Sequence, residues 1–110
     1  MNENVISVAN DFYPRPSGRY LKDGQYTGEA FRNRVLIPRL QEIKESGHDE
    51  ALIVDFSDVT MAGSSFLEEA FGGLVRTKLF TKDFLKKVLI IKSPRRPVIN
   101  DRIELYIKEA

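Results

Sequence analysis

Two short runs of mostly consecutive apolar residues constrain the fold of this chain more than any other feature. They span residues 51–56 and 88–91, and only Asp55 interrupts the first. Neither run approaches the roughly 20 residues that a membrane-spanning helix needs, whereas both have the length of a strand. A strand that is apolar at consecutive positions is typical of a sheet covered by helices. We therefore predict two strands, the first of them central and buried on both faces.

The segment between residues 27 and 47 carries the apolar spacing of an amphipathic helix. Thr27 can cap its first turn, and Gly47 can end it in the left-handed conformation. The apolar positions are Phe31, Val35 or Leu36, Leu40 and Ile43. Pro38 interrupts the pattern, since an interior proline costs about 3 kcal/mol. We expect either a kink at Pro38 or a second helix that begins there with the proline in its first turn.

Two more helices, a short first strand and a turn complete the pattern. Residues 5–8 are β-prone, and the Asp23-Gly24 pair is a turn signal that allows a hairpin. A second helical stripe begins after Ser64 and Ser65, and a third ends the chain, where Asn100 or Asp101 can cap it. The two stripes consist of Phe66, Leu67, Ala70, Phe71, Leu74, Val75 and Leu79, and of Ile99, Ile103, Tyr106 and Ile107.

The predicted order is strand, irregular turns, helix, strand, helix, strand, helix. Strands that alternate with amphipathic helices are characteristic of an α/β layered domain. The chain has 110 residues, without repeats or a break in composition, so we expect a single domain over residues 1–110.

The composition excludes several kinds of chemistry. There is no cysteine and one histidine, His48, so cysteine-based metal sites, thiolate nucleophiles and the usual serine–histidine triad are ruled out. We expect no enzyme activity, no cofactor and no metal. Seventeen basic and sixteen acidic residues give a net charge of +1, which does not favour a membrane or nucleic acid as partner. No signal peptide precedes the first strand, so we expect a cytoplasmic protein.

The start of the second predicted helix is the segment with the most candidate functional residues. A buried strand leads there through a loop containing Asp58 and Gly63 to Ser64 and Ser65. A helix start presents free N–H groups and a partial positive charge, which suit a bound phosphate or a phosphorylated serine. The alternative is structural: Ser65 and Glu68 match a capping box. In addition, the acidic pair formed by Glu68 and its neighbour Glu69 would compete with a bound anion.

Three other features each allow a functional and a structural interpretation. Gly72-Gly73 inside a helix indicates a close approach, either within the chain, which we favour, or to a partner. Asp55 and Asp58 after a strand, with Lys92 after the next, are similar to a response-regulator receiver, although the acidic pair at the first strand is missing. Arg95-Arg96 and the nearby lysines could contact nucleic acid, but spread charges of this kind usually form a solvated surface.

The helix start also carries a resemblance to a known family. Residues 52–60, followed by Gly63-Ser64-Ser65-Phe66, resemble the core of the STAS fold, which is typified by bacterial anti-sigma-factor antagonists. More closely, residues 18–31 and 64–76 resemble STAS-like domains of unknown function in small bacterial proteins. The resemblance implies a small layered domain, with amphipathic helices packed on a mixed sheet.

The resemblance also implies a function. In the antagonists, a serine at this helix start is phosphorylated by a histidine-kinase-like ATPase, and Ser65 falls nearest that position. Gly63 stands where the antagonists have aspartate, and Phe66 where they have glycine. We therefore expect a regulatory protein-interaction domain whose candidate residues are Gly63, Ser64 and Ser65, together with Asp58, Glu68 and Glu69. The alternatives are sensing of a nucleotide or other phosphate ligand at the same helix start and, less favoured, nucleic-acid binding.

Overall fold

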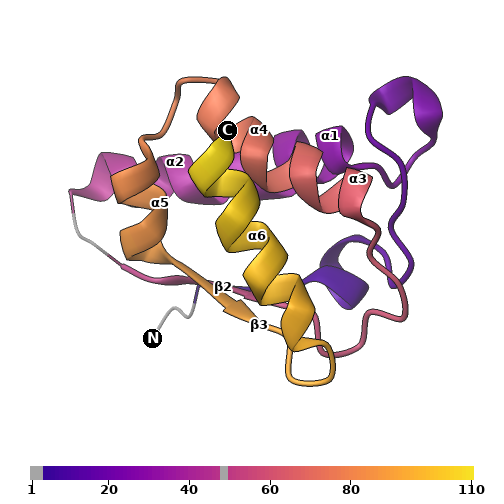
Figure 1. The fold of residues 1–110 in the computed structure, drawn as a ribbon. Coiled ribbons are helices and arrows are strands. Elements are labelled where there is room, and N and C mark those ends of the chain that lie inside the picture. Colours follow the sequence, from indigo (N-terminus) through magenta and orange to yellow (C-terminus); the bar gives the residue numbers. More distant parts are fainter. Residues whose placement is uncertain (1–3, 48–49) are drawn as a thin grey trace.

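A computed structural model describes residues 4–47 and 50–110, so His48 lies outside the described residues. The strands are β1 (Val5–Ser7), β2 (Leu52–Asp55) and β3 (Leu89–Lys92). The α-helices are α1 (Gly28–Phe31), α2 (Ile37–Ser46), α3 (Ser64–Leu67), α4 (Gly73–Arg76), α5 (Lys82–Val88) and α6 (Pro97–Glu109). Three π-helical segments, η1 (Val8–Phe12), η3 (Arg32–Leu36) and η4 (Glu68–Gly72), and one 3-10 turn, η2 (Leu21–Asp23), complete the order. The alternation of strands and helices is that of the predicted α/β domain (Figure 1).

The three strands form one parallel sheet in the order β1-β2-β3. Val5 lies opposite Ile53, and Ile53 lies opposite Ile90. The expectation of a mixed sheet is therefore wrong. The reason is that consecutive strands are joined by helical crossovers, which carry the chain back to the end of the sheet at which the previous strand began, so that the next strand runs in the same direction.

Helices cover one face of this sheet. Two crossovers of the usual right-handed kind, made in the same direction across a sheet, place their helices on the same side. Accordingly, Leu52 and Val54 of β2 are fully buried, whereas Ile53 between them is partly exposed and its neighbour Ile90 is 45% exposed. The prediction that the central strand is buried on both faces is thus wrong, although the strand itself is confirmed.

A compound helix of α1, η3 and α2 follows the first loop. Thr27 caps it as predicted, because its hydroxyl accepts a hydrogen bond from the backbone N–H of Ala30 at 3.3 Å. Gly47 ends it in the left-handed conformation, with φ of 74°. Pro38 lies in the first turn of α2, directly after the π-helical segment η3, and the backbone stays helical through Leu36 and Ile37. The structure therefore lies between the two alternatives: the proline stands in the first turn of α2, as the second expected, but no separate helix begins there.

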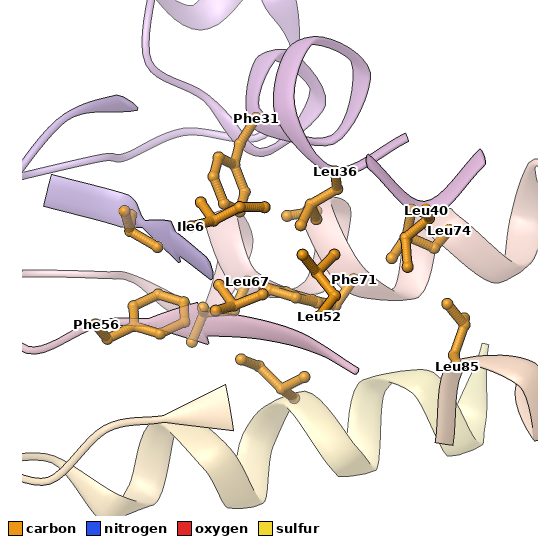
Figure 2. Packing of buried hydrophobic residues seen from close by; sticks show 14 of the residues in the cluster. Ile6, Phe31, Leu36, Leu40, Leu52, Phe56, Leu67, Phe71, Leu74 and Leu85 are labelled. Atoms are coloured by element: carbon orange, nitrogen blue, oxygen red, sulfur yellow. The ribbon is translucent and has the colours of Figure 1, made fainter. Parts of the chain in front are cut away.

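A second compound helix, made of α3, η4 and α4, packs between the first one and α6. Its buried side chains meet those of β2 and of the two flanking helices in a single core, in which Phe71 lies beside Leu52 of β2 and Leu74 beside Leu40 of α2 (Figure 2). Phe31 and Phe66 lie in the same core with their ring centroids 5.6 Å apart. This packing fixes the position and direction of the helix that starts at Ser64.

The remaining differences from the predicted elements are local. Instead of forming a hairpin, residues 21–23 form a 3-10 turn that ends at Gly24, whose φ is 151°. Helix α5 was not predicted; it includes Val88, so β3 begins one residue later than expected. The last helix begins at Pro97 with Arg96 as its N-cap, so neither Asn100 nor Asp101 caps it. Within the described residues, no helix combines the length and apolar character needed to span a membrane.

Candidate functional site

The loop between β2 and α3 is held at its start and near its middle by hydrogen bonds. The carboxylate of Asp55 accepts from the backbone N–H of Ser57 at 2.9 Å and from its hydroxyl at 2.5 Å. Farther along, the backbone N–H of Thr60 donates to the carbonyl of Pro14 at 2.9 Å. Asp55 therefore fixes its own turn, rather than standing free as a phospho-acceptor would.

Ser64 and Ser65 form the exposed first turn of α3. Gly63 is the N-cap residue, and a Cβ added to it would meet no atom within 4 Å. Both serines are exposed, and neither hydroxyl has a hydrogen-bond partner in residues 4–47 and 50–110. The next two residues, Phe66 and Leu67, are fully buried. The helix start thus presents two free hydroxyls on a rigid, well-packed base.

The predicted capping box of Ser65 and Glu68 is wrong. The helix begins two residues earlier than the box requires, with Gly63 instead of Ser65 as the N-cap residue. Glu68 turns away from the helix start and binds two arginines. Its carboxylate accepts from Arg19 Nη1 at 2.5 Å, and from Arg76 Nη1 and Nη2 at 2.6 and 3.0 Å.

A more deeply buried ion pair lies beside Glu68. Arg32 Nη1 donates to Glu69 Oε2 at 2.7 Å and to the Glu69 carbonyl at 3.0 Å. The side chains of the two residues are only 10% and 11% exposed. Because Arg32 opens one π-helical segment and Glu69 belongs to another, the pair ties the two compound helices together.

These five residues, Arg19, Arg32, Arg76, Glu68 and Glu69, are called the arginine–glutamate cluster below. Hydrogen bonds from Arg76, and then from Arg19, lower the pKa of Glu68 below its ordinary value of 4.5. The same contact with Glu68 raises the pKa of Arg19 and of Arg76. Three cations face two carboxylates, so the acidic pair does not leave the helix start negative. The expected competition of Glu68 and Glu69 with an anion is therefore removed by their own partners.

The adjacent glycines make room for this cluster. A Cβ at Gly73 would lie 2.3 Å from Arg32 Nη1, and one at Gly72 would lie 2.7 Å from Glu68 Oε2. The close approach signalled by Gly72-Gly73 is thus intramolecular, as the sequence favoured.

A pocket of about 370 Å³ opens beside the same loop, at the carboxyl ends of β2 and β3. The loop after β2 forms one wall and the turn after β3 forms the other. The lining residues are Phe56, Ser57, Asp58, Val59, Thr60, Ser93, Arg95 and Arg96. Of the predicted site residues, the structure places Asp58 in this pocket, and Glu68 and Glu69 in the arginine–glutamate cluster one turn or more beyond the exposed serines.

Most of the arginines in this cluster have no local sequence pattern that links them to the two glutamates. Arg76 follows Glu69 by seven residues, a spacing of two helical turns that places both on one face and could have been noticed. Arg19 and Arg32 come from segments 37 to 50 positions away, so no local pattern links them to the acidic pair. In the described part of the chain, no group of three or more metal-ligating side chains gathers.

Comparison with known proteins identifies a family. The profile of a family described as "STAS-like domain of unknown function (DUF4325)" matches residues 27–98, which include the second and third strands and both compound helices. No curated protein and no solved structure matches the chain.

Proposed function

The chain belongs to the family of STAS-like domains of unknown function, and from this premise we propose that it is a non-catalytic regulatory protein-interaction domain. The proposed contact surface is the loop and helix start formed by Asp58, Gly63, Ser64 and Ser65. The observation that carries the proposal is that both serine hydroxyls are exposed and without a partner in the described residues, on a helix whose next residues are fully buried. A rigid, uncovered helix start is suited to recognition by another protein because little ordering is needed on binding.

Apolar surface next to the serines supports a protein partner. Met61 is 43% exposed in the same loop. Tyr13 is 38% exposed and stacks on Tyr26 with their ring centroids 3.9 Å apart. The carbonyl of Pro14, the residue after Tyr13, accepts a hydrogen bond from the backbone N–H of Thr60, so the tyrosines lie beside the loop. Exposed methionine and tyrosine are enriched in protein interfaces.

The proposed control is phosphorylation of Ser65 or Ser64. A phosphate adds nearly two negative charges, which a helix N-terminus stabilises. Glu68 lies one helical turn beyond the two serines and binds Arg19, so the added charge would lie about one turn from that guanidinium. The change would alter the charge of the contact surface without disturbing the core. The resemblance to anti-sigma-factor antagonists indicates a histidine-kinase-like ATPase, or a related regulator, as the partner.

The test uses the intact chain and a histidine-kinase-like ATPase from the same organism. Incubation with ATP, followed by intact-mass measurement, should show one added phosphate in the wild type. The variant that lacks the modified serine, either Ser65→Ala or Ser64→Ala, should show none. In a binding titration, Ser65→Asp should weaken the complex about tenfold or more, since charge removed from or added to an interface commonly costs over 1.4 kcal/mol.

Two controls separate loss of contact from loss of folding. Ser65→Asp places a negative charge in the first turn of a helix, so its melting temperature should not fall. Ser46→Ala changes an exposed serine at the far end of α2 and should leave the affinity unchanged (Figure 1). Unchanged affinity in Ser64→Asp and Ser65→Asp, with no phosphate adduct, would contradict the proposal.

A further inference from the structure

We propose that the pocket at the carboxyl ends of β2 and β3 binds a small ligand through its phosphate group. Ligands of open α/β sheets bind outside the carboxyl ends of the strands, which is where this pocket opens. Its volume of about 370 Å³ lies near the lower end of the range for small-molecule sites. The pocket is therefore of a size for one compact ligand.

The charges that line the pocket favour an anion. Arg95 and Arg96 are exposed, and within residues 4–47 and 50–110 neither guanidinium has an ion-pair partner. The arginines of the arginine–glutamate cluster differ in this respect, because each of them is paired with a carboxylate. Asp58 is the one acidic residue that lines the pocket, so the lining carries one excess positive charge.

The backbone beside the two arginines is fixed. The N–H of Arg96 donates to the carbonyl of Ser93 at 3.1 Å, which closes the turn after β3. Arg96 is also the N-cap residue of α6, a helix of 13 residues, so the positive helix end borders the pocket. Two arginines on one tight turn can offer their guanidinium groups to the several oxygens of a phosphate, which arginine binds through paired hydrogen bonds.

The opposite wall of the pocket is partly apolar. Phe56 and Val59 are 4% and 7% exposed and line the pocket from the loop after β2. Next to them, the hydroxyls of Ser57 and Thr60 are already donated to Asp55 and Pro14. This wall can contact an apolar or planar group, so a phosphomonoester with a compact body suits the pocket better than phosphate alone. Because the same wall leads to Ser64, a bound ligand would lie next to the proposed contact surface.

The experiment is isothermal titration of the full chain with adenosine monophosphate, inorganic phosphate and adenosine. Adenosine monophosphate should bind saturably, inorganic phosphate more weakly, and adenosine not at all. Arg95→Ala and Arg96→Ala should each weaken binding about tenfold or more, as expected for loss of a charge-assisted hydrogen bond. Asp58→Asn should tighten binding about two- to fivefold, because it removes a repelling charge at the surface of the protein.

Arg102→Ala is the matched control, since Arg102 is an exposed arginine of α6 outside the pocket lining. It should leave the affinity within about twofold. The gain from Asp58→Asn cannot arise from unfolding, so it keeps the test valid if an arginine variant is unstable. The proposal is overturned if neither adenosine monophosphate nor phosphate binds saturably, if adenosine binds as tightly as its monophosphate, or if Arg102→Ala weakens binding as much as the pocket variants.

Discussion

At the scale of single residues, the most informative position is Gly73. A glycine inside a helix usually costs about 1 kcal/mol relative to alanine, so its replacement should stabilise a helix that has space around it. Here the space is occupied by the guanidinium of Arg32, which cannot move aside without leaving Glu69. The glycine is thus required by a buried ion pair and not by the backbone, whose φ of −60° is ordinary for a helix.

We predict that Gly73→Ala lowers the free energy of unfolding by about 2 kcal/mol or more, because it overpacks the site and disturbs the buried pair. The neighbouring Gly72→Ala is the control. Its Cβ would meet the ends of Glu68 and Arg76, and Arg76 is 44% exposed and able to shift. Urea denaturation of both variants measures the difference. Equal effects of the two substitutions would contradict the role given to Arg32.

A second residue-scale prediction concerns acid stability. The pKa of Glu68 is lowered in the folded chain by Arg76 and Arg19, so the unfolded state binds more protons as the pH falls. The contribution of the Glu68 carboxylate to the free energy of unfolding is complete above pH 4.5, and it is lost as the pH drops through the lower pKa of the folded state. Glu68→Gln should therefore be less stable than the wild type at neutral pH.

Denaturation curves measured between pH 7 and pH 2 test this prediction. The difference between wild type and Glu68→Gln should shrink as the pH falls below 4.5. A difference that stays constant over the whole range would show that the carboxylate charge contributes nothing to stability.

At the scale of elements, the sheet has one covered and one open face. Val54 is fully buried under the helices, while Ile90 is 45% exposed. We expect Val54→Ala to cost about 2 kcal/mol or more and Ile90→Ala less than about 1 kcal/mol, since the cost of deleting methyl groups follows their burial. Thermal or urea unfolding of both variants measures this. Similar costs would mean that something covers the second face.

The strands and compound helices could be predicted because their signals are local. Each of these signals depends on residues that are adjacent in the sequence. They are the apolar run of β2, the cap at Thr27 and the two serines that begin α3. The open face of the sheet could not be predicted, because a run of consecutive apolar residues does not reveal whether both faces of the strand are covered by helices of this chain. Helix α5 was missed because only Phe84, Leu85 and Val88 carry apolar side chains within it.

The candidate site could be predicted only in part. The exposed helix start follows from the strand–loop–helix pattern, and the resemblance to STAS-like domains is confirmed by the family match. The partners of Glu68 and Glu69 could not be found in the same way, because Arg19 and Arg32 approach from other segments. The pocket likewise forms only when the turns after β2 and β3 are brought together by parallel pairing.

At the scale of the whole molecule, the described residues pack around one core, and the loops beyond the carboxyl ends of the strands carry the candidate surfaces. The radius of gyration of 12.7 Å is that of a folded domain of this length. Buried side chains come from β1, from β2 and from both compound helices (Figure 2), and the partly buried Leu89 and Ile91 of β3 pack against them. The core therefore acts as the scaffold, and the proposed contact surface and the pocket lined by Arg95 and Arg96 share the loop that contains Asp58.

The central claim is that a partner binds the exposed helix start at Ser64. Amide hydrogen exchange of the chain, alone and in complex with a histidine-kinase-like ATPase from the same organism, tests it most directly. We predict slower exchange over residues 58–68 in the complex and unchanged exchange in β1, β2 and β3. Protection confined to the open face or edges of the sheet, with none over residues 58–68, would contradict the account.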